Sequence, residues 1–362
     1  MSLDTKKNHT LSLTLTTKWT VEKAHGWHQQ QRHYHQGVNF IPSTAVNQIQ
    51  FWYEFDQQEE RIVQELTWAV EKLGFTAVRV FLHDVNFYNF GRTFLRQVDR
   101  FLNITSELGL KTVLVMFEGI WNPIPKFLDI DKAILTQPDP VPFVHNSQWV
   151  QSPGREGLKN WDADDYMKEY VQTIVRRFAW DDRVLMIDLF DQPDNTNDYS
   201  YGYQGTRIPT LRDRQGTELP ALEKVQLVFD MIPSIFEWAR EAAPNRTVPF
   251  TVAAWQTVNP EENSSQISIE QLQIQSQLRT MYLNESDVLS FQHWGEPKDL
   301  LRVLDSIKRD YPGRPTVLTG FMARDDHSTF DPVVGDMYTR GIWTFSWGLV
   351  NGKTNTIFNS DR

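Results

Sequence analysis

Short apolar runs alternate with helical segments along almost the whole chain. Runs of four to eight apolar residues with little polar alternation predict parallel strands that are buried on both faces. The stretches between them show helical periodicity, as in Trp52 to Leu73, where one side carries Ile62, Val63, Leu66, Ala69, Val70 and Leu73. The predicted strands are Gly37 to Ser43, Ala77 to Leu82, Thr112 to Phe117, Val184 to Leu189, Thr247 to Ala254, Val288 to Phe291, Thr316 to Thr319 and Gly341 to Trp347.

Eight strands alternating with helices, in one composition regime and without a linker, predict a single α/β domain over residues 1–362. The expected architecture is a (β/α)8 TIM barrel. A doubly wound open sheet is the alternative, but no glycine-rich phosphate loop follows the first strand. Residues 1–36 are predicted to be an N-terminal extension. Residues 121–161, rich in Pro and Asn, are predicted to form a long loop near the active-site face.

Composition narrows the function classes. The formal net charge is -10, with the acidic residues spread along the chain, which argues against nucleic-acid or anionic-membrane partners. The absence of cysteine excludes disulfides, thiolate catalysis and Cys-ligated zinc. We see no membrane-length apolar run and no signal-peptide core, so we expect a soluble protein of undetermined localisation. We also expect no cofactor and a monomer.

Aromatic residues make up 13% of the chain and include 13 Trp, many of them just after apolar runs. This pattern is typical of clefts that stack planar ligands or sugars, so an aromatic small molecule or a carbohydrate is the expected partner. Filling of the core is the alternative for any single Trp.

The apolar run of Arg183 to Asn195 ends abruptly in acids, amides and proline, with Asp191 and Gln192 first. Such residues stop a strand. In α/β barrels, polar side chains at the carboxyl ends of strands form the active site, so we expect the chemistry near this stretch. Glu118 ends the preceding predicted strand in the same way.

Several motifs resemble a bacterial group of cellulase-like or xylanase-like glycoside hydrolases of the clan A, family 5-like type. They cover nearly the whole chain after about residue 20 and run through all eight predicted strands. The motifs are NFIPSTAVNQ (Asn39 to Gln48), VRVFLHD (Val78 to Asp84), NPIPK (Asn122 to Lys126), HNSQWVQSPG (His145 to Gly154), IDLFDQPDN (Ile187 to Asn195), FMAR (Phe321 to Arg324) and WGLVNGKTNTIF (Trp347 to Phe358). The resemblance implies a TIM barrel and a retaining glycosidase.

That mechanism needs two glutamates, an acid/base after strand four and a nucleophile after strand seven. This chain has Gln192 and Gly320 at those positions, and neither can do the chemistry. Further departures from the family pattern are Glu118 for Asp, Ile187 for Trp, Trp294 for Tyr and Ser346 for Asn. All lie on or near strand ends that face the barrel mouth, which indicates a rebuilt pocket. Engineering, natural loss or change of function, and deliberate inactivation remain three explanations.

The remaining groups predict an artificial base catalyst of the Kemp-elimination kind, a lyase acting on a planar aromatic substrate. Glu118 and Asp191 are the candidate bases, because apolar walls raise a carboxyl pKa and make the carboxylate a stronger base. Gly320 is predicted to leave a void. The substrate-binding candidates are Trp121, Trp294 and Trp347 as walls, with Gln192, Gln292 and Ser346 as hydrogen-bond donors.

Other interpretations stay open. Glu118 and Asp191 are alternatively paired with Arg79 or His83, which would lower their pKa values. A carbohydrate-binding protein that has lost its glutamates is the main alternative of another class. A Schiff-base lysine is not expected, since Lys126 and Lys353 belong to loop motifs. A triad of Ser346 with His293 is conceivable. The His-rich run (His25, His28, His33 and His35) is predicted to be a solvated polar segment, and no metal site is expected.

Overall fold

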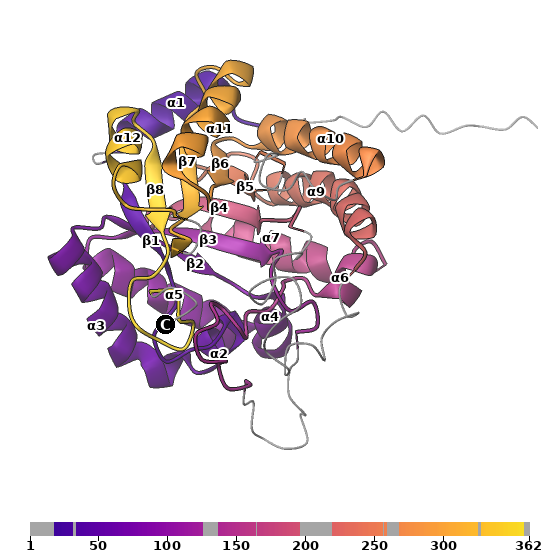
Figure 1. The fold of residues 1–362 in the computed structure, drawn as a ribbon. Helices are drawn as coiled ribbons and strands as arrows, with labels where there is room; N and C mark the ends of the chain where they lie inside the picture. Colours follow the sequence, from indigo (N-terminus) through magenta and orange to yellow (C-terminus); the bar gives the residue numbers. More distant parts are fainter. Residues whose placement is uncertain are drawn as a thin grey trace, which may run out of the picture.

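Eight parallel strands close into a barrel in sequence order (Figure 1). The computed structural model describes residues 18–31, 34–125, 137–163, 165–195, 219–255, 257–258, 268–324 and 327–357. β1 pairs with both β2 and β8, which confirms the predicted TIM barrel and excludes an open sheet. The strands are β1 (Gln36–Phe40), β2 (Ala77–Phe81), β3 (Lys111–Glu118), β4 (Val184–Asp191), β5 (Phe250–Ala254), β6 (Leu289–Gln292), β7 (Thr316–Phe321) and β8 (Trp343–Ser346).

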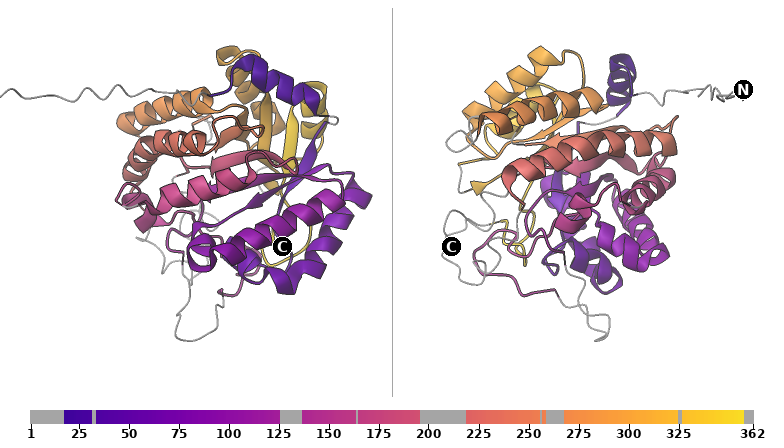
Figure 2. Two further views of the ribbon diagram at one scale, coloured as in Figure 1. Left: turned by 180° about the vertical axis from the view of Figure 1, so that it is seen from behind. Right: turned by 90° about the vertical axis from the view of Figure 1, so that its right-hand side faces the viewer.

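Helices surround the barrel, and Figure 2 shows them as an outer layer around the strands. The predicted helix over Trp52 to Leu73 is in fact two helices, α2 and α3. The short helices α4, α6 and α12, and the amino-terminal α1, were not predicted. The helices are α1 (Val21–Gln30), α2 (Gln48–Tyr53), α3 (Phe55–Leu73), α4 (Asp84–Phe90), α5 (Arg92–Glu107), α6 (Arg155–Lys159), α7 (Tyr166–Phe178), α9 (Ala221–Ala242), α10 (Ile269–Glu285), α11 (Pro297–Asp310) and α12 (Val333–Thr339).

The amino-terminal helix α1 packs against the start of β8. Trp27 meets the Trp343 ring edge-on at 5.3 Å, and the His28 ring stacks on Trp343 at 4.5 Å. His35 meets the same ring at 4.8 Å and is buried. The prediction of a solvated polar segment is therefore wrong for His28 and His35. His25 is exposed, whereas His33 lies outside the described residues.

The opposite end of the barrel, where the strands end, carries the long connection between β3 and β4. Backbone bridges join Glu118 to Ser152 and Asn122 to Val150, so this connection returns to the end of β3. Lys126 and the rest of residues 126–136 lie outside the described residues. We call this end of the barrel the mouth. Within the described ranges, no helix is long and apolar enough to cross a membrane.

Candidate functional site

The two candidate carboxyl groups are immediate neighbours at the mouth. Glu118 ends β3, Asp191 ends β4, and the two are register partners in the sheet. Side chains of register partners on adjacent strands project to the same side. Both residues are only 1% exposed, so the structure brings them together in the barrel interior.

Asp191 is paired with Arg79, which is one of the alternatives that the sequence left open. The Arg79 Nη2 lies 2.6 Å from Asp191 Oδ1 and 2.5 Å from Asp188 Oδ2, and all three side chains are buried. Residues three apart on a regular strand face opposite sides. Here the register shifts between Asp188 and Asp191, and this irregularity lets both carboxylates meet one guanidinium.

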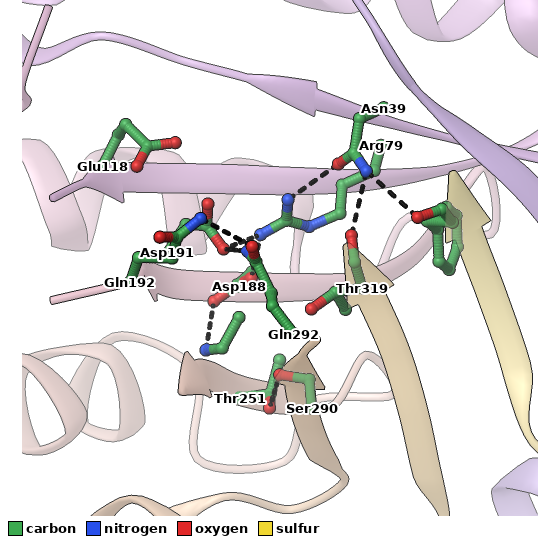
Figure 3. Close-up of polar contacts among 12 residues, drawn as sticks. Asn39, Arg79, Glu118, Asp188, Asp191, Gln192, Thr251, Ser290, Gln292 and Thr319 are labelled. Atoms are coloured by element: carbon green, nitrogen blue, oxygen red, sulfur yellow. Dashed lines mark hydrogen bonds and ion pairs between the residues drawn. The ribbon is translucent and has the colours of Figure 1, made fainter. Parts of the chain in front are cut away.

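A chain of side-chain amides continues from this ion pair, as Figure 3 shows. Gln292 donates its Nε2 hydrogen to Asp191 Oδ1, and its Oε1 accepts from Gln192 Nε2 at 2.6 Å. Gln192 has a left-handed backbone (φ 46°), and its Oε1 accepts from Asn195 Nδ2 at 2.8 Å. At the other end, Arg79 donates to Asn39 Oδ1 at 2.8 Å. We call this set the polar network: Asn39, Arg79, Asp188, Asp191, Gln192, Asn195 and Gln292.

The predicted void at Gly320 is not present. A Cβ atom built on Gly320 would lie 2.7 Å from Gln292 Oε1 and 3.0 Å from Trp294 Cζ2. Real Cβ atoms do not approach other atoms at 2.7 Å. The prediction was wrong because it treated Gln292 as a hydrogen-bond donor to a ligand, whereas the Gln292 carboxamide fills the space itself.

Three buried carboxyl groups, Glu118, Asp188 and Asp191, lie near a single guanidinium, that of Arg79. This imbalance of charge affects the protonation of the carboxyl groups. Burial raises the pKa of Glu118 well above its usual range, and the adjacent Asp191 carboxylate raises it further. Burial also raises the pKa of Asp188 to about 6, with Arg79 opposing and Asp191 adding to the shift. A neutral Glu118 can donate a hydrogen bond to Asp191, whereas two ionised carboxylates would repel each other. Asp191 is thus held by cationic and amide donors, whereas burial and the adjacent carboxylate favour the neutral form of Glu118.

The aromatic candidates have unequal access to solvent. Trp121 and Trp294 are half-buried. Trp347 is only 7% exposed, because it stacks on Phe81 with ring centroids 5.5 Å apart and meets Trp149 edge-on. Trp121 and Trp294 are therefore better placed than Trp347 to meet a ligand.

The remaining candidates are buried in local contacts. His83 lies 3.0 Å from Asp84 Oδ1, so this contact is not with Glu118 or Asp191. His293 has its Nε2 3.0 Å from the Glu296 carbonyl oxygen. The Ser346 backbone carbonyl accepts from Asn39 Nδ2 at 3.4 Å. None of these contacts forms the conceivable triad of Ser346 and His293, and within the described residues no cluster of His, Cys, Asp and Glu is suited to a metal ion.

Sequence reasoning missed three buried residues of this region. Asp188 could have been identified from the sequence, because it is a charged residue within the apolar run of β4. Asn39 gave no such signal. Lys224 comes from α9, is 3% exposed, and donates from Nζ to the Gly119 carbonyl at 2.7 Å. A buried lysine therefore does reach the mouth, although no strand end carries one.

Comparisons with known proteins support the fold. No protein-family model and no curated protein matches the sequence. Among solved structures, a GH5_18 variant from Bifidobacterium longum in complex with Manβ1-4GlcNAc matches with a TM-score of 0.54 and 14% identity, over 91% of this chain and 74% of that one. The exo-β-1,4-mannosidase Op5Man5 from an Opitutaceae bacterium matches with a TM-score of 0.51 and 15% identity, over 86% of this chain.

The family 1 β-glucosidase of Thermotoga maritima matches with a TM-score of 0.50 and 11% identity, over 82% of this chain and 77% of that one. This chain spans about half of the mannosidase, 51% of its length. At these identities the likeness concerns the fold: the chain has the barrel architecture that these glycosidases share.

Proposed function

We propose that this chain is a non-hydrolytic barrel that binds carbohydrate at its mouth. The observation that carries the proposal is that Gln192 and Gly320 stand where the resemblance implies two glutamates, and that the Gln292 carboxamide bonds to the first and packs against the second. An amide cannot transfer the proton, and glycine offers no nucleophile. This reasoning is the same whether engineering or natural divergence rebuilt the mouth.

Aromatic side chains support a carbohydrate as the ligand. We call five residues the aromatic rim: Tyr88, Trp121, Phe143, Trp294 and Phe330. All follow the carboxyl ends of strands β2, β3, β6 or β7. Tyr88, Phe143 and Phe330 are exposed, and the two Trp are half-buried. The apolar faces of sugar rings pack well on such surfaces.

The test is saccharide binding without turnover. Titration with cellotriose, β-1,4-mannotriose and Manβ1-4GlcNAc, followed by tryptophan fluorescence and calorimetry, should give saturable binding and no released sugar. Trp294→Ala should weaken binding. Trp68→Ala, which removes an exposed Trp on the outer helix α3, is the matched control and should bind as the parent does. Hydrolysis of any of these saccharides, or equal binding by both variants, would contradict the proposal.

A second candidate is proton abstraction from a planar aromatic substrate, and the raised pKa of Glu118 favours it. Asp191 is the poorer candidate, since Arg79 and Gln292 both contact its Oδ1. Because Glu118 acts as a base only when ionised, cleavage of an activated benzisoxazole should rise with pH through the raised pKa. Glu118→Gln should abolish this rise and Asp191→Asn should preserve it. A rate that is the same in Glu118→Gln excludes this chemistry.

A further inference from the structure

Gln292 is held in one position across the inner end of the mouth. It ends β6 and is fully buried. Its Nε2 donates to Asp191 on β4, and its Oε1 accepts from Gln192, which follows β4 (Figure 3). A side-chain amide with both ends engaged in buried hydrogen bonds is costly to move, because moving it leaves buried polar atoms unsatisfied.

Gly320 is complementary to this side chain. The two residues are register partners on β6 and β7. A Cβ on Gly320 would approach Gln292 Oε1 at 2.7 Å and Cδ at 2.8 Å. Gly320 is not among the residues with a left-handed backbone, so its conformation does not demand glycine. Glycine is required instead by the Gln292 carboxamide, which occupies the space that a side chain at residue 320 would need.

We propose that Gln292 is the specificity-determining residue of the mouth, because its carboxamide fills the inner end and confines a saccharide to the aromatic rim. This inference rests on the proposed carbohydrate binding. Gln292 occupies a hydrogen-bonding position on Asp191 Oδ1, so a ligand that bound this oxygen in its place would have to break that hydrogen bond. Shortening Gln292 should therefore open an inner binding position without any change to the rim.

Whether the Gln292 side chain fills the space beside Gly320 can be tested without a ligand. Gly320→Ala is made in the parent, in Gln292→Ser and in Gln292→Met, and the loss of Tm is measured within each background. Met has a bulk similar to Gln but makes neither hydrogen bond, so it separates filled space from polar contact. We expect Gly320→Ala to lower the Tm by several degrees in the parent and in Gln292→Met, and much less in Gln292→Ser. An equal loss in all three backgrounds overturns the proposal.

Ligand confinement is tested by titrating cellotriose and β-1,4-mannotriose into the parent, Gln292→Ser and Gln292→Met. We expect Gln292→Ser to bind at least one of them several-fold more tightly than the other two proteins do. Equal affinities overturn the inference. So does tighter binding by both variants, because the lost hydrogen bonds would then be the cause rather than the opened space.

The two proposals fail in different ways. Binding that is saturable but independent of residue 292 leaves the proposed function standing and removes Gln292 as its specificity determinant. If neither saccharide binds any variant, carbohydrate binding is contradicted, and the confinement of saccharides falls with it. The Tm comparison still decides whether Gln292 occupies the space beside Gly320.

Discussion

Arg79 is the residue on which the interior charges depend. It is fully buried and is paired with both Asp188 and Asp191. Removing one partner of a buried ion pair costs about 3–5 kcal/mol, because the remaining charge stays buried and unpaired. We expect Arg79→Met to lower the free energy of unfolding by an amount of this order in urea denaturation. Arg79→Met with Asp191→Asn should recover part of the loss. A cost below about 1 kcal/mol would mean that solvent reaches these carboxylates.

Glu118 should make the protein less stable as the pH rises. Its folded pKa lies above its usual value of 4.5, so the folded state binds the proton more tightly than the unfolded chain does. The stability from protonated Glu118 is fully present below pH 4.5 and is lost as the pH rises through the folded pKa. Asp188, whose pKa is raised from 3.8 to about 6, adds a loss of stability of the same sign as the pH rises through this range.

Glu118→Gln isolates this effect, because the amide stays neutral and can still donate to Asp191. We expect the variant to be more stable than the parent at pH 8 by at least about 1 kcal/mol, and the difference to shrink towards pH 4. Urea denaturation at pH 4, 6 and 8 measures it. Parallel pH profiles for the two proteins would show that Glu118 titrates normally.

At the level of elements, the Trp343 ring of β8 is a main contact between the barrel and α1. Trp27 and His28 both contact Trp343 on β8. Trp27→Ala should cost about 2 kcal/mol, less than a fully buried Trp, because the ring is half-buried. Fluorescence-monitored unfolding measures it, and a loss below about 0.5 kcal/mol would mean that α1 adds little stability.

The same contact should weaken in mild acid. Burial lowers the pKa of His28 below 6.5, with His25 on the same helix adding to the shift. The stability from neutral His28 is present above pH 6.5 and is lost as the pH falls through the folded pKa. His28→Phe keeps the stacking on Trp343 and cannot titrate, so it should remove this acid-side loss. His25→Gln serves as control, because His25 is exposed. An unchanged acid-side loss in His28→Phe would assign the loss to other groups.

The elements differ in how much the sequence could predict about them. β2 was predicted almost to the residue, because an apolar run ends there at turn residues. α1 was missed, since its anchor Trp343 lies more than three hundred residues away in the chain. The pairing of Asp191 with Arg79 was foreseen as an alternative, but Asp188 was not. The β4 irregularity that brings Asp188 and Asp191 to the same guanidinium lies in the pairing with β5, which no local pattern reveals.

At the scale of the whole molecule, the polar network connects strands that are far apart in the chain. Asn39 on β1, Arg79 on β2, Asp191 on β4 and Gln292 on β6 form one path of hydrogen bonds across the closed barrel. Asn39 also donates to the Thr319 carbonyl on β7 at 2.9 Å. Because the members of the network come from several strands, a substitution at one or two positions changes only part of what sets the chemistry of the mouth.

Introducing glutamates at residues 192 and 320, the positions that the family resemblance assigns to catalytic carboxylates, should therefore fail to create a glycosidase on its own. In Gln192→Glu with Gly320→Glu, the second side chain meets the Gln292 carboxamide 2.7 Å from its own Cβ. We expect background hydrolysis of 2,4-dinitrophenyl β-cellobioside by this double variant. Adding Gln292→Ser makes room for the nucleophile and should raise the rate about ten-fold or more, a change of about 1.4 kcal/mol in the barrier. Adding Gln292→Met instead keeps the space filled and should leave the rate at background. If the double variant already hydrolyses the substrate as fast as the triple variant, Gln292 does not exclude a carboxylate at residue 320.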